Sequence, residues 1–379
     1  MDTTLRLGEP RELLALIPHQ LGFRPLDSAV AVSLRPPAGE VGLVVRVDLA
    51  ALADDETGPR LARGLVAHLD RDGARRCVLA LYTDQDPRGL EAHPVHRAAA
   101  RLREAAQVPL GDVPAWVVTL DGYLALDCDE ACCPPGGRPL HELESTQVGA
   151  RMVLAGSVVA ATRDDVARIR RAPVEARRSV ARVRRRWEER RAAAAEAGPQ
   201  ATAAWRVGSV EAWRRATDPD VDGRRPASGS PLGRVEAGLA DRRVRDAVLV
   251  SLVPGTGDLP ERAVRGAGLD ARADAAVGAA VAAIVDPQVA VRPPDDVRRY
   301  EQVLEQVVAH GRDGGQAPAL TLLALVSWWR GDGARASVLL DRALAQEAGH
   351  RLALLLVDAL EAAVPPGWVR AGGEQGPPS

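Results

Sequence analysis

The chain of 379 residues contains no lysine and no asparagine, and all 49 of its basic residues are arginine. Such a bias is typical of coding drift in a GC-rich genome, so the abundance of arginine is weak evidence for guanidinium chemistry. Aromatic residues are also sparse, at 3% of the chain with a single Phe. The cores must therefore be built from Leu, Val and Ala.

Long apolar runs, a leader sequence and abundant cysteine are missing as well. The most apolar segments, 275–285 and 319–328, are shorter than the about 20 residues that a membrane-spanning helix needs. Charged residues interrupt the N-terminus where a secretion signal would be apolar. Four cysteines are too few for a disulfide scaffold, and a net charge of -2 gives no field that attracts polyanions. We expect a cytoplasmic protein without a membrane span.

The N-terminal part of the chain alternates between strand and helix patterns. β-branched apolar runs at 29–34 and 41–48 predict two strands joined by a turn that contains Pro and Gly. Residues 60–70 have the apolar spacing of a helix. The remaining patterns predict a strand at 76–83, a helix at 95–107, and strands at 115–121 and 123–127. This order of elements predicts an α/β domain with a mixed sheet over residues 1–165.

Every strong pattern beyond this domain is helical. Residues 166–230 read as an Arg-rich helical connector followed by a loop at 220–230, and residues 231–368 as an all-α domain. Residues 369–379 are rich in Gly and Pro without apolar periodicity, which predicts a disordered tail. The predicted helices cover 174–197, 201–216, 235–253, 260–285, 294–310, 317–330, 333–347 and 351–364.

One predicted helical pair has more specific features than the rest. Residues at the spacings of the tetratricopeptide pattern, where small side chains allow two helices to pack closely, follow Trp328 and Trp329. They are Gly331, Asp332, Ala336, Leu340, Ala343 and Leu344. Ala348 stands where the pattern usually closes with Pro, and only one such unit is clear. We expect a helical domain with one tetratricopeptide-like hairpin.

The segment that precedes the first predicted strand, residues 18–28 (PHQLGFRPLDS), is the first candidate site. It carries His19, Arg24, Asp27 and Ser28, which are residue types that bind ligands or form a nucleophile with its base. The Gly-x-Ser-x-Gly elbow of such enzymes is missing, and Ser28 begins a strand instead of following one. Arg24 remains a candidate for binding an anion.

A structural interpretation of the same segment is favoured. Pro18 would end a helix over 11–17, Gly22 would adopt a positive φ, and Phe23 would anchor the loop in the core. Asp27 or Ser28 would then satisfy backbone donors before the strand.

The second candidate site is Cys128, Cys132 and Cys133, which follow a predicted strand, together with His141. Three thiolates and an imidazole could hold a zinc ion tetrahedrally. Against this, adjacent cysteines point apart in extended backbone, and the paired Cys-x-x-Cys pattern is absent. The alternative is that the thiols are inert while residues 134–137 form a turn.

A redox role is a further alternative for these cysteines, because neighbouring thiols can form a labile disulfide. Asp127, Asp129 and Glu130 should raise the thiol pKa by repelling the thiolate, which disfavours reactivity.

Arginine is concentrated between Arg168 and Arg191, where eleven arginines stand against three glutamates. Such an excess could bind nucleic-acid phosphates. However, apolar residues recur at helical spacing, which indicates one buried stripe and a solvated basic face. They are Ala176, Val180, Val183 and Trp187. We do not expect nucleic acid as a partner.

Four stretches of the chain carry a family resemblance. The first is the opening PHQLGFRP at 18–25 with Asp27 and Ser28. The others are CDEACCPP at 128–135 with the Gly-Arg-Pro at 137–139, VRDAVL at 244–249, and WWRGDG at 328–333 continuing to 344 and 349–352. Together they resemble DUF4192, an actinobacterial family of unknown function, over roughly residues 10–369. The resemblance implies a bacterial cytoplasmic protein, and it brings no catalytic residue, substrate or cofactor.

Three functions remain open at this stage. The preferred hypothesis is a non-enzymatic interaction or regulatory protein, whose helical domain binds a protein or peptide partner. The second is an enzyme with its site at the strand ends of the α/β domain, where His19, Arg24 and Asp27 would meet the loop 128–141. The third is a zinc- or redox-responsive protein that uses the cysteines.

Overall fold

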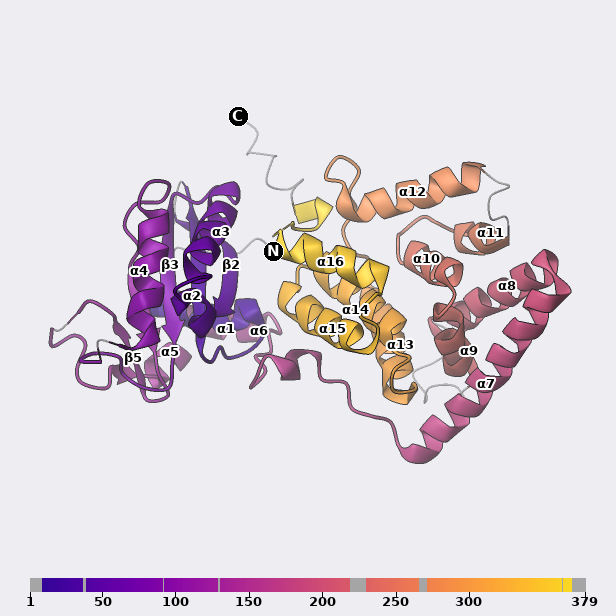
Figure 1. Ribbon diagram of the computed structural model, residues 1–379, viewed down its shortest axis with the longest axis horizontal. Helices are drawn as coiled ribbons and strands as arrows, with labels where there is room; N and C mark the ends of the chain where they lie inside the picture. The colour runs from indigo at the N-terminus through magenta and orange to yellow at the C-terminus, as the bar shows by residue number, and fades with distance from the viewer. Residues whose placement is uncertain are drawn as a thin grey trace. The chain divides into compact units, whose positions relative to one another are not determined.

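The computed structural model describes residues 9–36, 39–90, 92–128, 130–218, 230–265, 271–362 and 364–369. The chain forms two compact units, Met1–Val166 and Ala167–Ser379 (Figure 1). The predicted loop over 220–230 and the predicted tail over 369–379 lie outside the described residues, apart from Ser230 and Val369. A short 3₁₀ helix, η1 (Asp164–Ala167), contains the boundary between the units.

The first unit contains a mixed six-stranded sheet with the strand order β2-β1-β3-β4-β5-β6. β3 and β4 are parallel and are connected through α4 (Pro94–Ala106), and the other neighbouring strands are antiparallel. The strands are β1 (Ser28–Arg35), β2 (Glu40–Asp48), β3 (Arg76–Tyr82), β4 (Ala115–Val118), β5 (Gly122–Ala125) and β6 (Arg138–Pro139). The predicted α/β architecture with a mixed sheet is confirmed.

Helices cover both faces of this sheet because successive side chains of a buried strand point in opposite directions. Leu79 and Leu81 of β3 pack with the buried faces of α2 (Leu49–Ala53), α3 (Gly58–Arg71) and α4. The alternate residue Ala80 is equally buried on the other face. On that side α1 (Pro10–Leu21) contacts β2 and packs with α5 (His141–Glu144) and α6 (Gln147–Leu154).

The boundary of α1 differs from the prediction. The helix continues through Pro18 to Leu21 and ends at Gly22, whose φ of +75° is the left-handed conformation that glycine adopts readily. Phe23 is buried, as expected, and it forms a bridge with Ala160. Pro18 removes one backbone donor, but buried leucines on α1 hold the helix against the sheet and outweigh that loss.

The second unit is all-helical in its described residues, in agreement with the prediction. Its helices are α7 (Val174–Ala197), α8 (Pro199–Ala216), α9 (Ser230–Leu239), α10 (Arg242–Ser251), α11 (Leu259–Arg265), α12 (Ala271–Val285), α13 (Val297–His310), α14 (Ala317–Trp329), α15 (Gly333–Gln346) and α16 (Arg351–Glu361).

Two of the predicted helices are divided. The stretch 235–253 breaks after Leu239, because the carboxylate of Asp241 accepts hydrogen bonds from the N–H groups of Arg243 and Val244 and starts a new helix. The stretch 260–285 holds α11 and α12, and the residues between them, 266–270, lie outside the described ranges.

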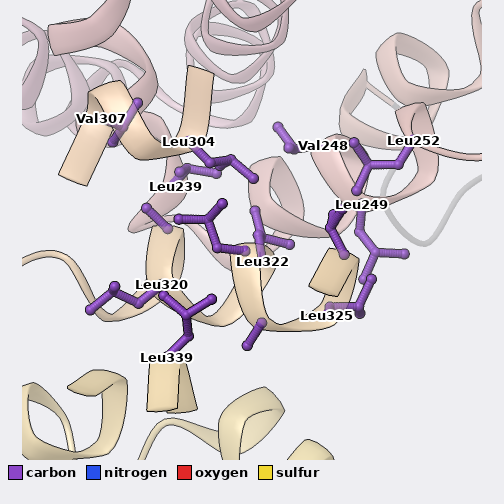
Figure 2. Close-up of a cluster of buried hydrophobic side chains, with 14 of the residues drawn as sticks. Leu239, Val248, Leu249, Leu252, Leu304, Val307, Leu320, Leu322, Leu325 and Leu339 are labelled. Atoms are coloured by element: carbon purple, nitrogen blue, oxygen red, sulfur yellow. The ribbon is translucent and has the colours of Figure 1, made fainter. Parts of the chain in front are cut away.

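The core of the second unit is centred on α14. All of its residues are buried, so it is surrounded by other helices instead of facing solvent on one side. Figure 2 shows Leu320, Leu322 and Leu325 of this helix among side chains from α9, α10, α13 and α15. None of the helices in the described ranges combines the length and apolarity needed to cross a membrane.

Candidate functional site

The cysteine loop, which is defined as Cys128 and residues 130–137, lies between β5 and β6 and brings three sulfur atoms together. The chain turns at Cys133, whose N–H donates to the carbonyl of Glu130 at 2.9 Å. Because of this turn, adjacent Cys132 and Cys133 do not point apart, and their sulfurs and that of Cys128 all lie within 4.8 Å of one another. The Sγ atoms of Cys128 and Cys132 are 3.4 Å apart.

This spacing suits a thiolate metal site. A zinc ion binds sulfur at about 2.3 Å, so two thiolates in a tetrahedral site lie about 3.8 Å apart. Cys128 is half-buried, Cys132 is exposed and Cys133 is buried. A metal ion could therefore enter the site from solvent on the side of Cys132. His141, predicted as a fourth ligand, begins α5 and does not belong to the group of metal-ligating side chains found among the described residues.

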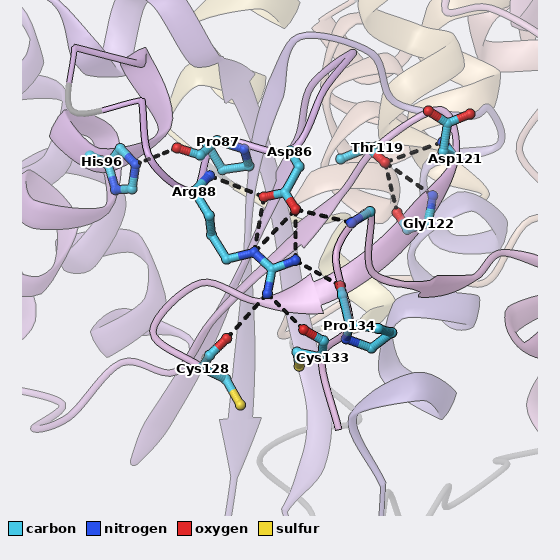
Figure 3. A network of polar contacts seen from close by, with 11 residues as sticks. Asp86, Pro87, Arg88, His96, Thr119, Asp121, Gly122, Cys128, Cys133 and Pro134 are labelled. Atoms are coloured by element: carbon cyan, nitrogen blue, oxygen red, sulfur yellow. Dashed lines mark hydrogen bonds and ion pairs between the residues drawn. The ribbon is translucent and has the colours of Figure 1, made fainter. Parts of the chain in front are cut away.

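An arginine from a different loop holds the backbone of the cysteine loop (Figure 3). Arg88 Nη1 donates to the carbonyls of Cys133 at 2.7 Å and Cys128 at 3.4 Å, and Nη2 donates to the carbonyl of Pro134 at 2.8 Å. The carboxylate of Asp86 binds the same guanidinium, with the shortest contact at 2.6 Å. It also accepts a hydrogen bond from the N–H of Gly136.

The other side of the loop is fixed at β6. Arg138 Nε donates to the carbonyl of Cys132 at 2.7 Å. Gly137 has a φ of +82°, and a Cβ there would lie 2.8–3.0 Å from the backbone of Tyr123. A Cβ on Gly122 would lie 2.6 Å from the carbonyl oxygen of Arg138. Backbone segments therefore approach so closely at this turn that only glycine fits.

The thiols differ in acidity. The pKa of Cys128 is lowered because its sulfur accepts hydrogen bonds from the backbone N–H of Glu130 and from Cys132. The pKa of Cys132 is raised to about 11, chiefly because Cys128 holds its proton. Repulsion by Glu130 does raise the pKa of Cys128, as expected, but this effect is weaker than the hydrogen bonds, so the net shift is downward.

The opening segment, residues 18–28, uses its polar groups for structure. His19 Nδ1 lies 3.0 Å from Ser157 Oγ, and burial lowers the pKa of its imidazole. Arg24 forms an exposed ion pair with Glu144 at 3.5 Å, and its N–H donates to the carbonyl of Ala160. The segment is thereby attached to residues 157–160.

Ser28 and Asp27 complete this attachment at the start of β1. Ser28 Oγ is buried, donates to the carbonyl of Leu26 at 2.5 Å and accepts from Arg46 Nε at 2.8 Å. It satisfies a carbonyl and a guanidinium, not the backbone donor that we expected. Asp27 has a φ of +43° and its carbonyl accepts from the N–H of Leu49.

In the part of the chain that the structure describes, no polar contact joins the two candidate groups. Within the described ranges, no hydrogen bond or ion pair links His19, Arg24, Asp27 or Ser28 to one another or to the three cysteines.

Sequence reasoning missed Asp86 and Arg88. They stand in the loop after the buried strand β3, at the carboxyl end of a parallel pair, where α/β folds place functional side chains. Their position directly after a predicted buried strand was the sequence signal that could have identified them as functional candidates.

The arginine-rich helix α7 buries Val180 and Trp187, in agreement with the predicted stripe. Arg184 is buried between them and pairs with Glu188 and with Glu236 of α9. Arg190 and Arg234 lie over the ring of Trp187. Part of the arginine content of this helix therefore stabilises helix packing.

Comparison with protein-family models gives a match to this chain. A family model described as a domain of unknown function, DUF4192, matches residues 10–367. Searches of curated proteins and of solved structures find nothing similar. Because the matched region covers nearly the whole chain and contains both units, the protein belongs to the DUF4192 family.

Proposed function

We propose that the first unit is a metal-responsive domain, which binds a zinc ion through the thiolates of Cys128, Cys132 and Cys133. The observation that carries this proposal is the convergence of the three sulfurs within 4.8 Å. Thiolates are the ligands that zinc and other soft cations prefer.

Binding is favoured over catalysis because, among the described residues, the two candidate groups have different polar partners. An enzyme built from His19, Arg24, Asp27 and the cysteine loop would need these side chains to share contacts around a substrate. Each of the polar groups at 19, 24 and 28 has a partner elsewhere. Among the described residues, by contrast, the polar contacts of the sulfurs of Cys128 and Cys132 are with one another, with the third thiol and with nearby backbone.

Metal analysis of the protein, purified and reconstituted with zinc under reducing conditions, tests the proposal. We expect one zinc per chain, and none for the variant with serine at positions 128, 132 and 133. Cys77→Ala is the matched control: Cys77 is buried in β3, its pKa is raised to about 11 by burial, and its loss should leave zinc binding intact. A wild-type chain that binds no zinc after reconstitution would contradict the proposal.

A second proposed function is recognition of a protein or peptide partner by the second unit. It is supported by the antiparallel pair α14 and α15, where Ala336 and Ala343 are fully buried at the positions that the tetratricopeptide pattern reserves for small residues. Asp332 accepts a hydrogen bond from the N–H of Arg335 and starts α15. The adjacent α16 exposes Leu354 and Leu355, an apolar surface that a partner would cover.

Crosslinking in native lysate tests this second function when it is paired with a surface variant. A partner that is captured by the wild-type chain and lost with Leu354→Asp and Leu355→Asp would support it. Val108→Asp is the matched control, because Val108 is an equally apolar, exposed residue of the first unit. Capture that is unchanged in the α16 variant, or no stoichiometric capture at all, would contradict it.

A further inference from the structure

Arg88 is the one described residue that binds both ends of the cysteine turn. Its guanidinium donates to carbonyls at 128, 133 and 134, and these three acceptors stand on either side of the sulfur cluster. We infer that Arg88 is a positioning residue that sets the metal affinity of the three-thiol site. This inference rests on the proposed function of the first unit.

The position of Arg88 explains how the sulfurs are brought together. Cys128 and Cys133 are five positions apart in the sequence, and their sulfurs converge only if the backbone at both positions is held close together. A single nitrogen, Nη1, binds the carbonyls of both residues. The second nitrogen, Nη2, extends the same contact to Pro134 (Figure 3). A planar guanidinium supplies this fork of donors, whereas an ammonium does not.

Asp86 makes the arrangement rigid. Its carboxylate holds the guanidinium through contacts of 2.6–3.1 Å and accepts the N–H of Gly136 at the far end of the loop. Asp86 and Arg88 follow β3, which lies inside the sheet. The cysteine loop is therefore attached to an interior strand of the sheet and not only to its own short strand β6.

Loss of the Arg88 contacts should reduce metal affinity more than it reduces the stability of the fold. Without the guanidinium, the three carbonyls can turn to water and the loop samples conformations in which the sulfurs are apart. Metal binding must then order the loop, and the free energy of that ordering reduces affinity. Groups that orient metal ligands typically change affinity about 10–100-fold when they are removed.

The experiment compares Arg88→Met with Arg88→Lys and with a matched control, Arg101→Met. Arg101 belongs to the same unit, its side chain is similarly buried, and it also binds a carboxylate and a carbonyl, those of Asp55 and Asp54. Zinc affinity is measured by competition with a chromophoric chelator. The cobalt-substituted protein reports the ligand geometry through its visible spectrum.

We expect Arg88→Met to weaken zinc binding about 10–100-fold and to change the cobalt spectrum. Arg88→Lys should restore part of the affinity, because it keeps the charge without the fork. Arg101→Met should bind zinc as the wild type does. Equal losses in Arg88→Met and Arg101→Met, or unchanged affinity in Arg88→Met, would overturn the inference.

A metal-independent readout separates this inference from the proposed function. A trivalent phenylarsenical bonds two thiols at once, so its affinity for the apo chain reports how closely the thiols are held. If the wild type binds no zinc but Arg88→Met loses arsenical affinity, the positioning role stands and the zinc proposal fails. If the wild type binds zinc and both affinities are unchanged in Arg88→Met, the positioning role fails and the zinc proposal stands.

Discussion

The opening segment and the cysteine loop both carry side chains suited to chemistry, but their reactive atoms have different partners. In the opening segment, His19 and Ser28 contact protein groups that attach the chain to its neighbours. In the cysteine loop, two arginines satisfy the backbone carbonyls. The sulfurs remain directed at one another. The difference teaches that a candidate site is recognised by reactive atoms that the fold does not use.

The largest expected effect is at Phe23, whose aromatic ring is buried in the first unit. Phe23→Ala should lower the free energy of unfolding of that unit by about 3–5 kcal/mol, through lost burial and a cavity. Hydrogen–deuterium exchange of β1 and β3 measures it. Leu26→Ala, at an exposed position of the same segment, is the control and should change stability by less than about 0.5 kcal/mol. Equal hydrogen–deuterium exchange in the two variants would contradict the structural role of Phe23.

A smaller loss is expected at Ser28. Ser28→Ala removes two hydrogen bonds of a fully buried hydroxyl and leaves the Leu26 carbonyl without that donor, which should cost about 1–3 kcal/mol. Ser33→Ala is the matched control in the same strand, because the buried Ser33 hydroxyl has no hydrogen-bond partner. Denaturant unfolding should leave the control at least as stable as wild type. A loss at Ser33 as large as at Ser28 would contradict the structural role of the opening segment.

Acid should weaken the opening segment through His19. Burial lowers the pKa of its imidazole below the ordinary 6.5, so the unfolded chain binds a proton more readily than the folded one. The stability that neutral His19 contributes is therefore complete above about pH 6.5 and is lost as the pH falls through the folded pKa.

His19→Gln should reduce the loss of unfolding free energy that occurs below about pH 6.5, and denaturant unfolding curves at a series of pH values measure this loss. His93 of the first unit and His350, the residue that precedes α16, also have pKa values lowered by burial, and they contribute to the remaining acid dependence. If the stability of His19→Gln falls with decreasing pH as steeply as that of the wild type, protonation of His19 does not destabilise the opening segment.

The smallest effect on stability is expected for the exposed thiol of Cys132. Cys132→Ser should change the free energy of unfolding by less than about 0.5 kcal/mol. It should nevertheless abolish a disulfide that peroxide forms in the apo wild type. In that reaction both thiols are oxidised, each loses its hydrogen, and the peroxide is reduced to two waters.

The two sulfurs need to approach by only about 1.4 Å from 3.4 Å to form this bond. Peptide mapping by mass spectrometry should find Cys128 linked to Cys132, with Cys77→Ala as a control that keeps the bond. Preferential linkage to Cys77, or no linkage, would contradict the description of the cysteine loop.

Much of the fold could be predicted because local sequence patterns determine it. The β-branched runs of β1 and β2 and the continuously apolar α14 are readable without tertiary context. The errors lie where tertiary packing overrides a local signal. Pro18 normally ends a helix, but packing carries α1 past it. The apolar pattern of α9 and α10 continues across a break that Asp241 makes.

The site was predictable in its residue types and not in its geometry. The cysteines are visible in the sequence, but the convergence of their sulfurs depends on a turn and on Arg88, which is forty residues away from Cys128. The contacts of His19 with Ser157 and of Arg24 with Ala160 likewise join positions more than a hundred residues apart in the sequence. Such long-range contacts leave no periodic signal in a single sequence.

The glycines at 122 and 137 have a consequence for relatives of this chain. Any side chain at either position would push β5 and β6 apart, so that the end of the cysteine loop would no longer be held against β5. A homologue with a larger residue there would have to abandon this geometry even if it retained every sulfur. Inspection of these two positions therefore distinguishes relatives able to hold the three sulfurs in this arrangement from those that have the thiols without it.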